Sequence, residues 1–396
     1  MASGEAVAAR PARRVWRPVL FAAVLISILG LLFGLPWWTL VIAGAQWPTG
    51  VSVAGTLVFT CGLLALPVLM YLGHGRRQLD WAARTGDTLL GVVWVLFAWS
   101  LLGNLLRLTL SFAGVADPTR SRVVGAAVLA VSVSLMIWGY AEATRLPRLR
   151  QVEVHLPRLG TGLDGVRVVL LTDTHYGPIN RAAWSAEVVA AVNELAPDIV
   201  CHTGDIADGS VARRLSQAAP LADVQARLAR VYVTGNHEYF GEVDGWLGHM
   251  RELGWEPLHN RHLVVERGGS RLVVAGVDDA TAEASGRPGH RADHGAALAG
   301  ADPELPVLLL AHQPKQVGAA MTHGVDLQLS GHTHGGQIWP FQLLVRLDQP
   351  VVAGLSRHGG RTWLYTSRGT GFWGPPFRIF APSEITVLTL RSSTAH

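Results

Sequence analysis

Five short polar clusters in the second half of the chain combine residue types and spacings that could do chemistry. They are Asp173-Thr-His175, Gly204-Asp-Ile-Ala-Asp208, Gly235-Asn-His-Glu238, His312 and Gly331-His-Thr-His-Gly-Gly336. Each follows an apolar, strand-like run, so we expect each cluster where a buried strand ends and a loop begins. In an open α/β sheet, ligands bind at that edge. Carboxylate, imidazole and amide groups gathered there would suit a divalent ion such as Mn, Fe or Zn.

The order and spacing of these clusters resemble the calcineurin-like metallophosphoesterases. The pattern of that family runs D-x-H, GD-x-x-D, GNH-[DE], a lone His and GH-x-H, and all five motifs occur here in order across about 165 residues. Three further stretches, Gly276–Asp279, Gly331–Gln337 and Ser367–Pro376, are similar to the bacterial membrane-associated phosphodiesterases of the YkuE and YaeI type. The resemblance covers roughly residues 150–392 and leaves out the first 145.

The resemblance implies a centre of two divalent metal ions (Mn, Fe or Zn) and assigns its ligands residue by residue. One ion would take Asp173, His175, Asp205 and His334, and the other would take Asp205, Asn236, His312 and His332. Asp205 would therefore bridge the two ions. His237 would be the catalytic residue, which donates a proton to the leaving oxygen or stabilises charge on the phosphoryl group. Asp208 and Glu238 would orient the side chains that bind the metals.

Each residue that could face the substrate has more than one interpretation. Asp279, Arg368 and Arg378 lie in stretches similar to the family, where arginine suits a phosphate group, but surface ion pairs would explain them equally well. An aromatic set after Gly371 could form a lip at the site, touch a bilayer or pack as an ordinary loop; it consists of Phe372, Trp373 and Phe377. Cys201 lies in a strand pattern close to Asp205, and we expect it to be a core residue rather than a ligand.

The first part of the chain has a different composition. The whole chain is 49% hydrophobic and only 16% charged, and the apolar excess lies at the front. Four apolar stretches, approximately 18–35, 51–72, 88–106 and 123–140, come close to the ~20 residues that cross a bilayer. We therefore predict an N-terminal all-α membrane region, residues 1–145, with four transmembrane helices. A C-terminal α/β metallophosphoesterase domain, residues 146–396, would follow, and the resemblance implies two packed β-sheets flanked by helices.

Arginine placement predicts the orientation in the membrane. Ten arginines flank the spans on the side of both chain ends, against three on the other side, Arg107, Arg120 and Arg122. This bias predicts a cytoplasmic catalytic domain. Arg13-Arg14 before an apolar run also resembles a twin-arginine export signal, which keeps an extracytoplasmic domain as the alternative.

The resulting hypothesis is a membrane-anchored, metal-dependent phosphohydrolase that cleaves a phosphodiester or pyrophosphate bond. The membrane region favours a phosphorylated substrate that is lipid-linked or an envelope precursor. The alternative is a membrane sensor or scaffold that uses the phosphoesterase domain to bind a ligand. A transporter is a third option, against which stand the few polar residues in the spans, chiefly Asn104 and Arg107. The formal charge of +4 is modest, and we do not expect nucleic acid to bind.

Overall fold

The computed structural model describes residues 16–393, which form two compact units. One unit consists of the residues up to Leu66 together with Leu96–Val131, and the other consists of Pro67–Val95 together with the residues from Ser132 on. The boundary between residues 145 and 146 stays a prediction. Arg10, Arg13 and Arg14, which contribute to the predicted orientation, lie outside the described residues.

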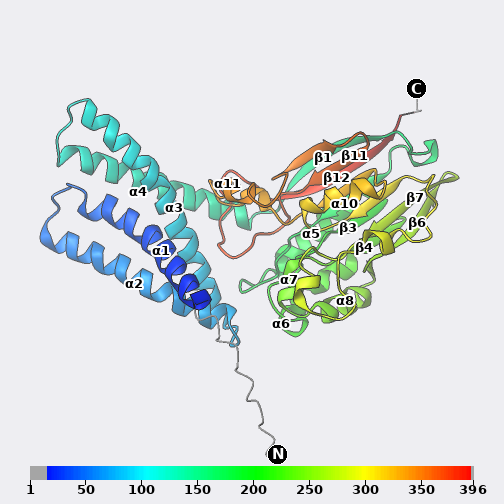
Figure 1. The fold of residues 1–396 in the computed structure, drawn as a ribbon, viewed down its shortest axis with the longest axis horizontal. Helices are drawn as coiled ribbons and strands as arrows, with labels where there is room; N and C mark the ends of the chain where they lie inside the picture. Colours follow the sequence, from blue (N-terminus) through cyan, green and yellow to red (C-terminus); the bar gives the residue numbers. More distant parts are fainter. Residues whose placement is uncertain (1–15, 394–396) are drawn as a thin grey trace, which may run out of the picture. The chain divides into compact units, whose positions relative to one another are not determined.

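Four helices of the described chain are long and apolar enough to cross a membrane. They are α1 (Trp16–Trp37), which continues into the π-helical turn η1 (Trp38–Ile42), α2 (Thr49–His74), α3 (Asp80–Phe112) and α4 (Thr119–Thr144). They are coloured blue to cyan in Figure 1. Each predicted apolar stretch lies in one of these helices, which confirms the four-helix prediction. The helices extend beyond the apolar stretches, and α3 begins at Asp80, whose carboxylate pairs with Arg214 at 2.7 Å.

The long helices keep large apolar side chains exposed, and two polar side chains of α3 find partners among neighbouring residues. Phe21 is 71% exposed and Ile137 is 68% exposed, as suits surfaces that contact lipid. Asn104 Nδ2 donates to Thr39 Oγ1 at 2.7 Å, and the Arg107 guanidinium lies 4.8 Å from the centre of the Trp38 ring. These contacts support a packing role for Asn104 and Arg107 rather than a transport path.

The rest of the second unit contains two six-stranded sheets (Figure 1). The first has the order β1-β12-β2-β3-β4-β5, with β1 (Arg148–Leu156), β12 (Glu384–Ser392), β2 (Arg167–Leu171), β3 (Ile199–His202), β4 (Ala229–Tyr232) and β5 (Glu256–Pro257). The second has the order β10-β11-β9-β8-β7-β6, with β10 (Gly354–His358), β11 (Thr362–Thr366), β9 (Leu327–Ser330), β8 (Val307–Leu310), β7 (Ser270–Gly276) and β6 (Arg261–Arg267).

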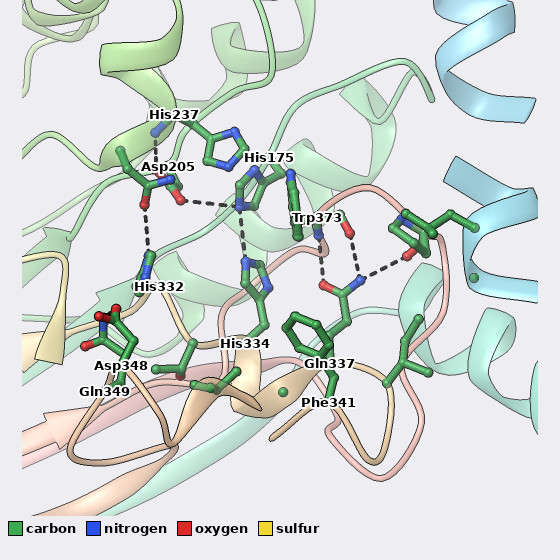
Figure 2. A pocket seen from close by; sticks show the side chains of 18 of the residues that line it. His175, Asp205, His237, His332, His334, Gln337, Phe341, Asp348, Gln349 and Trp373 are labelled. Carbon is green, nitrogen blue, oxygen red and sulfur yellow. Dashed lines mark hydrogen bonds and ion pairs between the residues drawn. The ribbon is translucent and has the colours of Figure 1, made fainter. Parts of the chain in front are cut away.

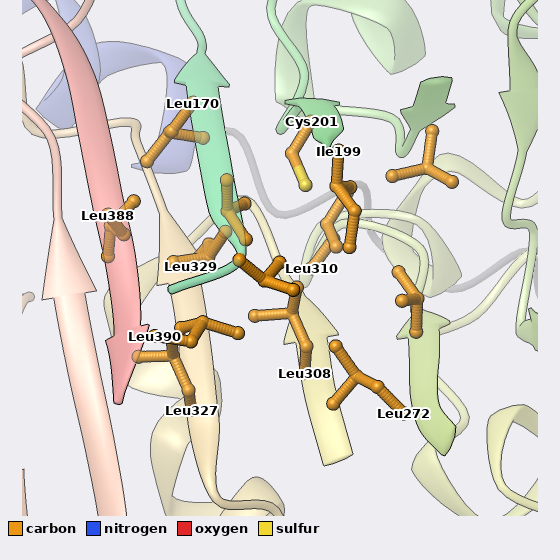
Figure 3. Close-up of a cluster of buried hydrophobic side chains, with 14 of the residues drawn as sticks. Leu170, Ile199, Cys201, Leu272, Leu308, Leu310, Leu327, Leu329, Leu388 and Leu390 are labelled. Atoms are coloured by element: carbon orange, nitrogen blue, oxygen red, sulfur yellow. The ribbon is translucent and has the colours of Figure 1, made fainter. Parts of the chain in front are cut away.

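The two sheets pack face to face through an apolar core. Figure 3 shows Leu170 and Ile199 from the first sheet among Leu308 and Leu327 from the second. These strands read as nearly continuous apolar runs because parallel strands in such a layer are buried on both faces. Cys201 lies in the same cluster and is fully buried. Burial raises the pKa of its thiol, so Cys201 is the small core residue that its strand position predicts.

Helices cover the outer faces of the sheets, which confirms the predicted fold class. The outer face of the first sheet packs against α5 (Ala182–Glu194), α6 (Val211–Ala218) and α8 (Val243–Glu252). The outer face of the second sheet packs against α9 (His294–Ala297) and α10 (Val317–Thr322). The short helices are α7 (Asn236–Phe240), α11 (Gln342–Val345), η2 (Thr161–Leu163), η3 (Ala219–Asp223), η4 (Glu283–Ser285), η5 (Pro314–Gln316) and η6 (His334–Gly336).

Candidate metal centre

The five polar clusters meet where strands of both sheets end. In the first sheet β2, β3 and β4 are mutually parallel, and in the second β8 and β9 are parallel. The loops after these strands are tied together by backbone hydrogen bonds: Asp173 N donates to Gly204 O at 2.9 Å, and Gly331 N donates to His312 O at 3.0 Å. Segments far apart in the sequence are therefore held at one edge.

Several of the predicted ligands occupy backbone conformations that L-residues rarely adopt. The φ angle is +52° at Asp173, +43° at His175, +53° at Asp205, +70° at His332 and +50° at His334. Left-handed conformations at non-glycine residues cost free energy and cluster at functional sites. The neighbouring loops hold these five residues in place, so the strain accompanies a fixed arrangement of side chains.

Two glycines allow the loops to approach each other closely. A Cβ atom at Gly331 would collide with Thr172 Oγ1 and Asp173 Oδ2, and one at Gly235 would collide with Asp205 Oδ1. Any larger residue at either position would push a predicted ligand out of the site.

The first group of ligand atoms converges from three loops. The Nε2 atoms of His175 and His334 lie 3.1 Å apart. Asp173 Oδ1 lies 3.4 Å from His334 Nε2, and Asp205 Oδ2 lies 3.6 Å from His175 Nε2. Figure 2 shows His175 between Asp205 and His334. Two imidazole nitrogens and two carboxylates therefore face one small volume.

The second group shares Asp205 with the first. Asp205 Oδ2 lies 3.1 Å from His312 Nε2. Asn236 Oδ1 lies 3.1 Å from His312 Nε2 and 2.8 Å from His332 Nδ1. The structure therefore brings all seven predicted ligand residues together in two groups, with the Asp205 carboxylate at the junction.

The donor set fits divalent metal ions. Burial lowers the pKa of His332 to about 3, and burial followed by the charge of His175 lowers the pKa of His334 well below its usual range. Both imidazoles are thus neutral, as metal ligands must be. At His312 burial opposes protonation, but the nearby Asp205 carboxylate raises its pKa well above the usual value. The site therefore favours a positive charge beside Asp205.

Other contacts fix the orientation of the imidazole rings. His175 Nδ1 lies 3.0 Å from Asp208 Oδ1, and His312 Nδ1 lies 2.7 Å from the carbonyl of Thr203. Both contacts leave Nε2 turned towards the centre. Hydrogen bonds of this kind hold the ligating rings of metal sites.

His237 lies beside the centre and shares Asp208 with His175. Its Nδ1 atom is 2.7 Å from Asp208 Oδ1, and its ring meets the His175 ring edge-on with 4.6 Å between centroids. Burial alone would lower its pKa, but Asp205 and Asp208 outweigh burial and raise the pKa to about 9. These two carboxylates therefore favour the protonated form of His237, next to the predicted ligands.

Glu238 acts differently from the prediction. Its carboxylate accepts hydrogen bonds from the backbone N–H groups of Asp205, Ile206 and Gly235, at 2.9, 2.8 and 2.6 Å. It therefore positions the backbone around Asp205 instead of orienting a ligand side chain. A carboxylate buried beneath two loop backbones pairs with the N–H groups that face it, because unpaired buried donors are costly.

Two of the candidate substrate-facing groups are engaged inside the protein. Arg378 is fully buried and donates to the carbonyls of His334 and Ala381 at 3.0 and 3.1 Å. Asp279 is also fully buried, and both its oxygens accept from Gln313 Nε2 at 3.0 Å. Arg378 and Asp279 therefore hold loops together, and this geometry favours a structural role for both.

The centre opens into a cavity of about 440 Å³. His175, His237 and His332 line one part of it, whereas Leu90, Gly91 and Trp94 of α3 line another. Trp373, one of the three candidate lip aromatics, also lines the cavity. The sequence did not single out the three α3 residues, because an apolar wall inside an apolar stretch has no distinctive spacing.

Comparisons with known proteins agree with the motifs. Residues 166–336 match the family model of the calcineurin-like phosphoesterases. A transmembrane protein with metallophosphoesterase domain from Danio rerio is 34% identical over 365 residues, which cover 87% of this chain and 84% of that protein. A metallophosphoesterase of Helicobacter pylori strain J99 is 38% identical over 64% of this chain and 66% of its own length. YkuE of Bacillus subtilis is 30% identical over 59% of this chain and 81% of its own.

The similarity to the Danio rerio protein covers 87% of this chain and so extends beyond the motif-bearing domain into the region of the membrane helices. These similarities favour an enzyme over a sensor or scaffold that only binds a ligand. The chain therefore belongs to the calcineurin-like metallophosphoesterases, in the branch similar to YkuE, and is a metal-dependent phosphoesterase with four membrane-length helices.

Proposed function

We propose that this enzyme hydrolyses a phosphodiester or pyrophosphate bond with the help of two divalent ions (Mn, Fe or Zn). The observation that carries the proposal is the position of Asp205, whose Oδ2 atom lies 3.6 Å from His175 Nε2 and 3.1 Å from His312 Nε2. One carboxylate thus serves both groups of ligand atoms. A shared carboxylate is what a pair of closely spaced ions requires.

Each ion would be held by four residues. The first would be held by Asp173, His175, Asp205 and His334, and the second by Asp205, Asn236, His312 and His332, the two groups whose ligand atoms converge. When bound, the ions supply charge stabilisation at phosphorus and make water a better nucleophile at neutral pH.

His237 would supply the proton that hydrolysis needs. In the reaction a water oxygen forms a bond to phosphorus and gives up a proton to the solvent, the bond from phosphorus to the leaving oxygen breaks, and the leaving oxygen takes up a proton. His237 lies at the cavity wall with Nδ1 held by Asp208 at 2.7 Å, which directs its Nε2 edge away from Asp208. A protonated imidazole held in this way can donate to the leaving oxygen.

The test is an assay of purified full-length protein loaded with Mn²⁺ against phosphomonoesters, phosphodiesters and pyrophosphates. We expect diesters or pyrophosphates to be cleaved in preference to monoesters, and we expect elemental analysis to find two ions per chain. Metal and ligand binding without turnover of any ester would instead favour the sensor. No more than one ion per chain in excess Mn²⁺ would contradict the paired centre.

We also propose that the catalytic domain faces the cytoplasm. The described arginines on its side of the spans are Arg17, Arg76, Arg77, Arg84, Arg145, Arg148 and Arg150, against Arg107, Arg120 and Arg122 on the other side. Basic residues near span ends favour the cytoplasmic side. A C-terminal alkaline phosphatase fusion should stay inactive while a C-terminal green fluorescent protein fusion fluoresces. Strong phosphatase activity from the fusion would show the extracytoplasmic alternative.

A further inference from the structure

The cavity at the metal centre has two chemically different ends. Asp205, His237 and His332 lie at one end. In Figure 2, Trp373 and Phe341 lie on the other side of His334 from Asp205. The volume of about 440 Å³ exceeds what a phosphoryl group fills and falls in the range of roughly 300–1,000 Å³ that is typical of small-molecule sites. A substrate that filled the cavity would therefore carry a substantial apolar part.

The apolar end is built on a membrane-length helix. Leu90 and Trp94 of α3 line it together with Phe341 and Val345. The Trp94 and Phe341 rings meet edge-on with 5.7 Å between centroids, and Trp94 Nε1 donates to the carbonyl of Ile338 at 3.3 Å. The two rings therefore pack against each other, and the indole N–H of Trp94 has a hydrogen-bond acceptor within the wall. The same helix, Asp80–Phe112, is apolar and long enough to cross a membrane.

Exposed apolar side chains continue outward from this wall. On and next to α11, Leu343 is 57% exposed, Leu344 is 49% exposed and Leu347 is 83% exposed. These residues flank Val345, which lines the cavity. A soluble domain rarely exposes several large apolar residues in one short segment unless the segment meets a partner or a membrane. Because α3 is a membrane-length helix, a lipid surface is the partner that fits.

We propose that the apolar end of the cavity binds the hydrocarbon chain of a membrane amphiphile whose phosphoryl group reaches the metal centre. The substrate class is thus a lipid-linked phosphodiester or pyrophosphate, and the inference rests on the proposed hydrolase function. The α11 segment lies at the membrane surface, and the amphiphile slides from the lipid into the cavity along α3. The hydrocarbon chain stays in contact with apolar side chains throughout, which avoids its transfer through water.

Chain length provides the first test. The substrates are alkyl 4-nitrophenyl phosphates from methyl to octyl, all below their critical micelle concentration and at one fixed detergent concentration. In each, a water oxygen bonds to phosphorus, the bond to the nitrophenyl oxygen breaks and nitrophenolate leaves, so the chemistry is constant along the series. We expect kcat/KM to rise with each methylene, by at most about fourfold, until the cavity is full.

A flat profile along the series, with nitrophenolate released from every ester, would overturn the lipid inference and leave the hydrolase proposal intact. Release of nitrophenolate from none of the esters, at any metal loading, would instead overturn the hydrolase proposal. The two failures are therefore distinguishable in one experiment with the unaltered full-length enzyme.

A matched pair of variants provides the second test. Val345→Trp fills the cavity, whereas Val264→Trp places the same ring on an exposed position of β6 that does not line the cavity. We expect the octyl-to-methyl ratio of kcat/KM to fall at least about tenfold in Val345→Trp and to stay within about twofold of the original in Val264→Trp. Equal ratios in both variants would overturn the placement of the chain. Since the measure is a ratio, a partial loss of folded protein does not change it.

The last test identifies the kind of lipid that supplies the hydrocarbon chain. Phosphodiesters of the same headgroup are offered in vesicles with acyl chains or with isoprenoid chains, beside a headgroup analogue without any chain. Faster cleavage of either lipid than of the analogue supports the proposal and identifies the kind of chain. Cleavage of the analogue at the same rate as both lipids would overturn it.

Discussion

Two histidine–aspartate clusters in the catalytic half look alike by composition and differ in what surrounds their atoms. Asp173, His175 and His334 form one cluster, and His259, Asp278 and His290 form the other; in each the ligand atoms lie within 4.8 Å of one another. In the first, two imidazole Nε2 atoms face each other at 3.1 Å between carboxylates. In the second, His259 Nδ1 lies 2.6 Å from Asp278 Oδ1, a hydrogen-bond distance.

The second cluster closes on itself through hydrogen bonds. Asp278 Oδ2 accepts from Asn260 Nδ2 and from Arg291 N, both at 3.2 Å, and the Tyr239 hydroxyl lies 3.2 Å from His290 Nδ1. Each acceptor there meets a donor. In the metal centre, several imidazole nitrogens and carboxylate oxygens lie close together with too few hydrogen-bond donors among them. A bound cation would satisfy all of these acceptors. Proximity alone therefore does not distinguish a metal site from a hydrogen-bonded cluster, whereas the balance of donors and acceptors does.

The largest expected effect comes from removing the shared carboxylate. Asp205→Ala should lose both ions and lower kcat/KM about 10⁴-fold or more, because each ion contributes several kcal/mol to the stabilisation of the transition state. Elemental analysis and the nitrophenyl ester assay check this. Retention of two ions in this variant would show that Asp205 does not bridge them.

His237→Ala should keep both ions and lose about 10²–10⁴-fold in turnover, the usual range for a general acid. The loss should shrink for nitrophenolate, a leaving group that needs little protonation. A uniform loss across leaving groups would assign His237 to stabilising charge on the phosphoryl group. Full activity on a poor leaving group would remove it from the mechanism.

Asp208→Asn tests the contacts that orient the side chains of His175 and His237. Asp208 meets both His175 and His237, at 3.0 and 2.7 Å, so its loss should weaken metal affinity about 10–100-fold. Metal titration of the folded variant measures this. Unchanged affinity with reduced turnover would mean that Asp208 serves His237 alone.

His259→Ala probes the second cluster and should leave metal content and turnover unchanged. It removes the partner of a buried carboxylate, so the free energy of unfolding should fall by about 1–3 kcal/mol. Denaturant unfolding measures the change. If His259→Ala loses an ion, the cluster is a metal site and the comparison fails.

The contribution of His259 to stability should also depend on pH. The hydrogen bond to Asp278 raises the pKa of His259 above 6.5. The protonated imidazole is thus favoured in the folded state, and its stabilisation is fully present below pH 6.5 and lost as the pH rises through the raised pKa. The difference in unfolding free energy between the wild type and His259→Ala should therefore narrow with rising pH. A difference that widened would contradict this charge assignment.

Much of the site could be predicted because the potential metal ligands directly follow strand-like apolar runs in the sequence. The runs before Asp173 and Asp205 became β2 and β3, and the run before His312 became β8. The residue types in the loops also identify the donor set. The contact made by Glu238 could not be predicted in this way, because it depends on which backbone N–H groups two distant loops present to it.

The apolar wall of the cavity could not be predicted from the sequence either, for a different reason. Leu90 and Trp94 look like any other apolar residues of a membrane span, and their place at the centre depends on tertiary packing. Short elements without strong periodicity, such as β10 and α6, were also not predicted. In contrast, each predicted span lies within a helix, because long apolar runs leave few alternatives.

The left-handed backbone at Asp173, His175, Asp205, His332 and His334 has a consequence for the life of the protein in the cell. Without ions, the chain holds these conformations at a cost of roughly 1–3 kcal/mol each, which is a large part of the stability of an ordinary domain. Ions that bind only the folded chain would offset that cost, so metal supply would act on abundance as well as on activity. Chains made during metal starvation would unfold more often and reach proteases sooner.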